Sequence, residues 1–146
     1  MTGSLQQIID FAVEQEIKAA AFYREIAGRT DFKSVSRVIE EFAAMEDTHV
    51  LKLRMLDKTE FIETAAADDL QLSDYLAEPA GENPGYQEIL VLAIKKEQRS
   101  ALLYHDLAQK AGDTETGKLF RSLSFEEMKH KQFFEKKYDS EILTEN

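Results

Sequence analysis

The sequence contains no cysteine, and this absence excludes several classes of function. Without thiols the chain can form no disulfide, has no cysteine nucleophile and cannot bind zinc or an iron–sulfur cluster through thiolates. The absence also fits a cytoplasmic protein, which is the compartment we expect. Long apolar runs are missing as well, since the longest, Ile89–Ile94, is far too short to span a bilayer. The first residues lack the pattern of a signal peptide, so we expect a soluble, unprocessed protein.

Positive charge is scarce, because 18 Lys and Arg residues face 28 Asp and Glu residues and leave a formal net charge of −10. A nucleic acid or an anionic membrane would be repelled by such a chain, so we expect neither as a partner. What the chain has is enough apolar material for a core: 43% of its 146 residues are hydrophobic. That length and composition predict one domain that spans residues 1–146.

Apolar residues recur three or four positions apart in four long stretches, which predicts four amphipathic helices and an all-α fold. The short connection within each pair of helices predicts two helical hairpins, and a long connection between the pairs makes a four-helix bundle. The predicted parts are a hairpin 4–58, a crossover 59–83, a hairpin 84–138 and a tail 139–146.

The predicted helix ends depend on capping signals. Ser4 begins a capping box for the first helix, and Asp31 can cap the second, which we expect over residues 32–58. Asn83 and Pro84 form a good cap and first-turn pair for the third helix, which should end near Ala111. The crossover is predicted to hold a turn or two of helix around residues 70–76, and lysines near the end of the last helix, before residue 138, should favourably meet the helix dipole.

Two acidic residues and a histidine interrupt the apolar stripes of each hairpin. Glu46 and His49 stand three residues apart, and they recur 81 positions later as Glu127 and His130. A single glutamate precedes each pair by 30 residues, Glu16 in the first hairpin and Glu97 in the second. The same shift of 81 maps inner-face residues of one hairpin onto those of the other, with Tyr23 falling on Tyr104. An internal duplication around inward-facing polar residues explains this pattern most simply.

Burying even one unpaired ion costs several kcal/mol, so four inner carboxylates require compensation. No matching inward set of Lys or Arg residues is visible, which makes a metal the natural counter-charge. Four glutamates carry about −4 and neutral histidines carry nothing, so two divalent cations would bring the site close to neutral. A rotation of 300° between residues three apart lets Glu and His ligate the same centre from one helix. One glutamate from each of two helices and Glu-x-x-His from the other two is the dimetal carboxylate pattern of helix bundles.

The spaced motifs Glu16-x6-Tyr23, Glu46-x2-His49, Glu97-x6-Tyr104 and Glu127-x2-His130 resemble the rubrerythrin-type branch of the ferritin-like superfamily over essentially the whole chain. The resemblance implies a ferritin-like four-helix bundle with two iron ions, for which manganese or zinc could substitute. It implies that the single glutamates each bind one iron, that the glutamates of the pairs bridge, and that each histidine caps an iron. The two tyrosines are predicted to be core residues whose hydroxyls orient the ligand carboxylates.

Two features depart from the family pattern. A cysteine-free chain cannot carry the rubredoxin-like iron site of full-length rubrerythrins, so electrons must come from an external electron donor protein. Ser100 stands where rubrerythrins carry an additional glutamate, three residues after the ligand of the third helix. We expect an oxidoreductase in which an Fe(II) pair reduces hydrogen peroxide or O2. The alternatives are an iron storage or delivery protein with ferroxidase activity, and a structural bundle that holds zinc or manganese without turnover. Family members usually dimerise, which implies a homodimer.

Overall fold

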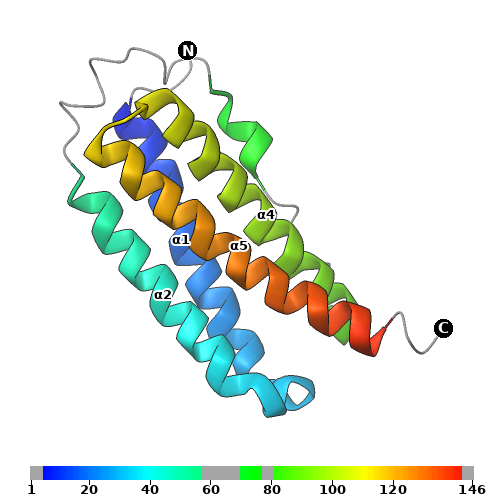
Figure 1. Cartoon of the computed structure of the whole chain (residues 1–146). Coiled ribbons are helices and arrows are strands. Elements are labelled where there is room, and N and C mark those ends of the chain that lie inside the picture. Colours follow the sequence, from blue (N-terminus) through cyan, green and yellow to red (C-terminus); the bar gives the residue numbers. More distant parts are fainter. Residues whose placement is uncertain (1–4, 57–69, 77–80, 143–146) are drawn as a thin grey trace. The chain divides into compact units, whose positions relative to one another are not determined.

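The computed structural model describes residues 5–56, 70–76 and 81–142, and the chain divides into two compact units, residues 1–70 and 71–146. The described residues contain four long α-helices and no β-strand. Each unit is built around one antiparallel pair of these helices, as Figure 1 shows. That the two units form one domain stays a prediction.

The first unit is a hairpin of α1 (Leu5–Ala27) and α2 (Ser36–Arg54), which a 3₁₀ helix, η1 (Thr30–Val35), connects. The Ser36 hydroxyl donates a hydrogen bond to the Ala27 carbonyl oxygen at 2.8 Å, so the first residue of α2 is tied to the last residue of α1. The apolar stripes of both helices are buried, which is why the two amphipathic sequences pair.

The second unit contains α4 (Tyr86–Ala111) and α5 (Glu115–Glu141), with a short 3₁₀ helix, η3 (Leu72–Tyr75), packed on α4. The Tyr75 hydroxyl donates a hydrogen bond to Asp106 Oδ2 on α4 at 2.6 Å. Burial and the neighbouring Asp106 carboxylate raise the pKa of Tyr75. This contact fixes the position of η3 on the hairpin.

A tight turn joins α4 to α5. Gly112 follows α4 with φ of 63°, a left-handed backbone conformation that glycine adopts without strain. Thr114 then caps α5, because its hydroxyl accepts a hydrogen bond from the Gly117 amide at 2.9 Å. A Cβ at Gly117 would lie 2.2 Å from the Gly112 carbonyl oxygen, so the close approach of turn and helix requires a glycine there.

The predicted bounds of α2 are wrong at both ends. α2 begins at Ser36, four residues later than expected, because residues 30–35 form η1 instead. The expected cap, Asp31, forms an ion pair with Arg29 at 2.9 Å, and this guanidinium holds the pKa of Asp31 below its usual range. The helix ends at Arg54, four residues before the predicted end. Ser4, the cap predicted for α1, lies outside the described residues.

The predicted cap of α4 is also wrong, although its end at Ala111 is confirmed. Asn83 has φ of 50°, and Gly85 directly precedes the helix without a side-chain cap. At the other end of the unit, α5 continues three residues past Tyr138, so its last turn contains no basic residue and the expected dipole contact of the lysines is absent. The helix expected at residues 70–76 is the short η3, and most of the crossover lies outside the described residues. Within the described part of the chain, no helix is both long and apolar enough to span a membrane.

Candidate metal centre

The six predicted ligands are all buried, with exposed fractions of 0–1%. α1 and α2 carry Glu16, Glu46 and His49, whereas α4 and α5 carry Glu97, Glu127 and His130. Among the described residues no Lys or Arg is buried, as the sequence predicted. The burial of four acidic residues without a buried basic one is the unusual feature of this core.

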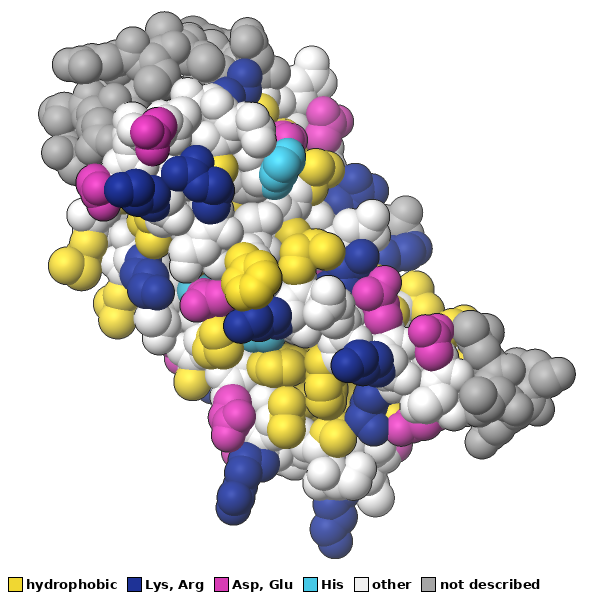
Figure 2. Space-filling view, viewed as in Figure 1, with side chains coloured by type: hydrophobic (Ala, Val, Ile, Leu, Met, Phe, Trp, Pro, Cys, Tyr) yellow, Lys and Arg dark blue, Asp and Glu magenta, His cyan; other side chains and the backbone are white. Residues whose placement is uncertain are grey.

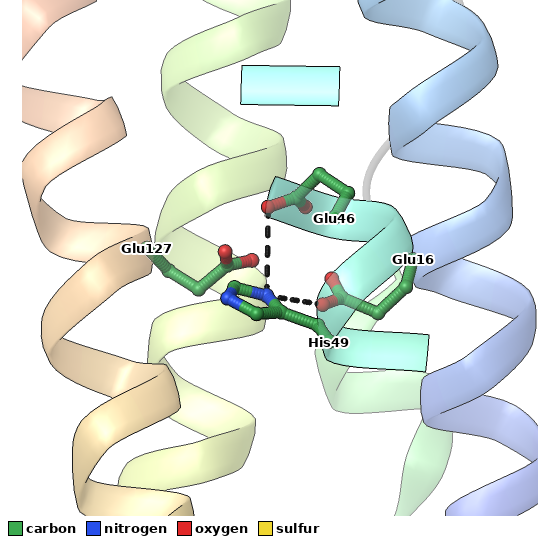
Figure 3. A group of neighbouring side chains, drawn as sticks. All are labelled: Glu16, Glu46, His49 and Glu127. Atoms are coloured by element: carbon green, nitrogen blue, oxygen red, sulfur yellow. Dashed lines mark hydrogen bonds and ion pairs between the residues drawn. The ribbon is translucent and has the colours of Figure 1, made fainter. Parts of the chain in front are cut away.

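The first cluster brings α1 and α2 together. His49 Nδ1 lies 2.6 Å from Glu16 Oε2, which is a hydrogen bond between the helices. The same nitrogen lies 3.6 Å from Glu46 Oε1, an ion-pair distance. Figure 3 shows the two carboxyl groups pointing toward the imidazole ring. One potential ligand atom from each of these three residues lies within 4.8 Å of the others. A single cation could contact all three.

The second cluster repeats the first between α4 and α5 with longer distances. His130 Nδ1 lies 3.4 Å from Glu97 Oε2 and 3.9 Å from Glu127 Oε1. One potential ligand atom from each residue again lies within 4.8 Å of the others. Each hairpin therefore places two carboxylates and one imidazole close together, and that these residues bind metal stays a prediction.

The local sequence explains why these polar groups point inward. On α2, Ala43 lies three residues before Glu46, Val50 lies four after it, and Leu53 lies four after His49; all three are buried. Residues three and four apart share one face of a helix, so the glutamate and the histidine occupy the stripe that the apolar neighbours bury. Their inward direction follows from periodicity, whatever their charge.

The residues fit a divalent metal ion. Glu16 Oε1 is buried and has no hydrogen-bond partner, while Oε2 of the same carboxylate bonds to His49. A buried carboxylate oxygen in this state lacks the compensation that water or a cation would supply. Carboxylate and imidazole donors together suit iron, manganese and zinc, and the described residues offer no buried cation in their place.

Tyr23 and Tyr104 are buried, which confirms their predicted place in the core. The Tyr23 ring meets Phe42 edge to face with centroids 6.0 Å apart, and Tyr104 stacks on Phe120 with centroids 6.3 Å apart. That their hydroxyls orient ligand carboxylates stays a prediction. His105, which follows Tyr104 in the sequence, is exposed and belongs to no cluster.

The fold and the two clusters define a class, namely all-helical proteins with a buried cluster of carboxylates and histidine that could hold a metal ion. Within that class, the Rubrerythrin family model matches residues 88–146, a stretch that contains most of α4, all of α5 and the ligands Glu97, Glu127 and His130. No curated protein and no solved structure matches the chain.

The match confirms the resemblance to rubrerythrins for residues 88–146. The four long helices, with no strand among the described residues, are consistent with the expected all-α, ferritin-like four-helix bundle. The first hairpin lies outside the match, yet it repeats the second in sequence and in its buried cluster. The individual ligand roles remain predictions. Sequence reasoning did not single out the contact between Tyr75 and Asp106, because no local pattern announces a hydrogen bond between residues 31 apart.

Proposed function

We propose that Glu16, Glu46, His49, Glu97, Glu127 and His130 bind two iron ions, and that the chain uses the Fe(II) pair to reduce hydrogen peroxide or O2. The observation that supports this proposal best is the pair of buried clusters, each with two carboxylates and one imidazole and neither with a buried Lys or Arg among the described residues. The match to the Rubrerythrin family over residues 88–146 favours iron over other divalent metals.

When bound, an Fe(II) pair supplies the two electrons that, together with two protons, convert hydrogen peroxide into two water molecules. The protein supplies the donors and their environment. The proposed ligand carboxylates are buried, with exposed fractions of 0–1%, so the surrounding side chains shield them from bulk water. In such a low-dielectric site the attraction between opposite charges is stronger than in water. The hydrogen bond between Glu16 and His49 holds one carboxylate and one imidazole in place across two helices.

The deciding experiment is anaerobic loading with Fe(II), followed by rapid mixing with hydrogen peroxide and, separately, with O2. We expect fast oxidation by at least one oxidant and many turnovers when a reductant restores Fe(II). Oxidation followed by retention of a growing iron core would favour storage instead. No oxidation by either oxidant would refute the redox proposal and leave a structural metal site.

A matched pair of variants tests the ligand assignment. Glu127→Ala removes a buried carboxylate, whereas Glu126→Ala removes its half-buried neighbour on the same helix. We expect the first variant to bind less iron per chain and the second to bind as much as the wild type, measured by elemental analysis after desalting. Equal iron contents in the two variants would contradict the proposed centre.

A further inference from the structure

The outer face of α5 carries positive charge although the chain as a whole is acidic. Between residues 118 and 136 the exposed residues of α5 include four basic and no acidic side chains. We call these exposed residues the basic face of α5: Lys118, Arg121, Ser122, Phe125, Met128, Lys129, Gln132 and Lys136. They recur three or four positions apart, so they share one side of the helix.

Two large apolar side chains lie in the middle of the basic face. Phe125 is 61% exposed and Met128 is 37% exposed. Lys129 Nζ lies 4.6 Å from the centroid of the Phe125 ring, which places a charge directly over the aromatic surface. In Figure 2, dark blue and yellow side chains follow the diagonal on which α5 lies in Figure 1. An exposed aromatic centre with a charged rim is typical of protein interfaces.

The first hairpin provides an internal comparison, because its α2 is the copy of α5. The positions equivalent to the basic face are Arg37, Glu40, Glu41, Ala44, Asp47, Thr48, Leu51 and Met55, all exposed. They hold one basic and three acidic side chains, so this face has a net charge of −2 where the face of α5 has +4. The buried clusters are the same in both hairpins, whereas the outer faces carry opposite charge. The basic face is therefore a property of α5 that its copy α2 lacks, and it does not follow from the repeat.

The charges on the basic face are available to a partner. Within the described ranges, no ion pair involves Arg121, Lys129 or Lys136, while Lys118 pairs with Glu115 at 3.1 Å. The helix dipole does not account for these residues, because the last turn of α5 contains no basic side chain. Arg121 donates a hydrogen bond to the Gly112 carbonyl oxygen at 3.3 Å, which leaves its charge without an acidic partner within 4 Å among the described residues.

The basic face also lies close to the proposed metal ligands. Met128 and Lys129, which are exposed, fall between Glu127 and His130 in the sequence. Glu127 and His130 are buried on the opposite side of the helix. An α-helix with its side chains is about 10–12 Å across. A protein docked on the basic face would thus be separated from the ligand side chains by roughly the width of one helix.

We propose that the basic face of α5 docks a small acidic electron-carrier protein, the external donor that the proposed function requires. The inference rests on that function. Two reduced carriers would each lose one electron, and two Fe(III) would gain one each to return to Fe(II). Carboxylates of the carrier would meet the four basic side chains, and its apolar surface would cover Phe125 and Met128. The compact positive stripe fits a small acidic protein, since the remainder of a chain with net charge −10 would repel an extended polyanion.

The test measures binding of two acidic carriers, a [2Fe–2S] ferredoxin and a flavodoxin, to the purified full-length protein by calorimetry. We expect binding by at least one carrier that weakens as salt is added, because exposed charges are screened. Arg121→Glu with Lys129→Glu should weaken it about tenfold or more. The control Arg37→Glu with Lys52→Glu makes the same change in net charge on exposed residues of α2 and should leave binding unchanged.

The apolar centre has its own matched pair. Phe125 and Leu51 are both 61% exposed, on α5 and on α2 respectively, so neither Phe125→Ala nor Leu51→Ala should disturb the fold. Only Phe125→Ala should weaken carrier binding. Unchanged thermal melts of all variants would show that lost binding reflects the surface and not unfolding.

The measurements of carrier binding and of Fe(II) oxidation distinguish a failure of the docking proposal from a failure of the proposed function. If neither carrier binds, or if the reversals on α5 and α2 weaken binding equally, the docking proposal is overturned. Sedimentation tests whether the basic face binds a second copy of the chain instead. The docking proposal is also overturned if the wild type self-associates and only Arg121→Glu with Lys129→Glu abolishes this self-association. If the wild type binds a carrier but Fe(II) is never oxidised, the docking surface stands and the proposed function fails. Reduction of the oxidised protein by dithionite, which needs no docking, should be equal in wild type and α5 variant.

Discussion

Replacing Glu46 by glutamine should change the stability of the protein in opposite directions with and without metal. In the first cluster a carboxylate oxygen of Glu16 and one of Glu46 lie within 4.8 Å of each other, both buried. Two like charges at that separation repel by roughly 3 kcal/mol at an effective dielectric constant of about 20. Glutamine keeps the shape of the side chain and removes the charge, although it also loses the attraction to His49 at 3.6 Å.

We therefore expect Glu46→Gln to stabilise the chelator-treated protein by about 2 kcal/mol, which corresponds to roughly 4–8 °C in Tm for a chain of this size. With metal present the sign reverses, because the variant has lost a negatively charged ligand. A ligand at 100 times its Kd stabilises a protein by about 2.7 kcal/mol, and we expect the variant to gain much less than this from added metal.

Circular dichroism melts in chelator and in excess Mn(II) measure both effects without oxidation of the metal. Glu41→Gln removes an exposed carboxylate from the same helix and should leave both melts unchanged. If Glu46→Gln lowers Tm in chelator as much as it does in Mn(II), the cluster does not hold repelling charges and the electrostatic reasoning is wrong.

Three further predictions follow from other contacts. Glu97→Ala should lower the metal content from two ions to one per chain, measured by elemental analysis. Tyr75→Phe removes the hydrogen bond to Asp106 and should lower the free energy of unfolding by about 1–2 kcal/mol in urea titrations. The pKa of Tyr75 is raised in the folded state, so the folded protein keeps the Tyr75 proton at pH values where the unfolded chain, with a tyrosine pKa of about 10, loses it. Wild-type stability should therefore fall as pH rises above about 10. This fall should be shallower in Tyr75→Phe, which has no hydroxyl to titrate. Gly117→Ala places a Cβ 2.2 Å from the Gly112 carbonyl oxygen and should cost about 1–3 kcal/mol.

Each of these changes has a control. Glu88→Ala removes an exposed carboxylate from α4 and should leave two ions bound, so an equal loss of metal in both variants would contradict the assignment of Glu97. A decline above pH 10 that is equally steep in Tyr75→Phe would show that other groups cause it. Gly85→Ala adds a Cβ with no neighbour within 4 Å and should be tolerated, so a comparable loss there would disprove the steric explanation for Gly117.

The sequence predicted the features that depend on periodicity and on the repeat. Glu16 and Glu46 were expected inside because they occupy positions where the spacing calls for an apolar residue, and both are fully buried. The ends of the helices were harder to predict, because the same residues serve caps and turns. Asp31 has the side chain of a cap, yet a nearby Arg29 pairs with it and a 3₁₀ helix intervenes before α2. Asn83 likewise adopts a positive φ instead of capping α4. Such choices depend on contacts that local sequence does not encode.

The opposite charges on the two sides of α5 have a practical consequence in electrochemistry. The inner side carries Glu127, whereas the exposed residues between 118 and 136 include four basic and no acidic side chains, so the basic face presents positive charge to solvent. An electrode coated with a carboxylate-terminated monolayer should therefore adsorb the protein through α5, even though its sequence pI of about 4.8 suggests repulsion. In this orientation α5, which carries Glu127 and His130, would lie next to the electrode, and voltammetry should measure the reduction potential of the proposed iron pair.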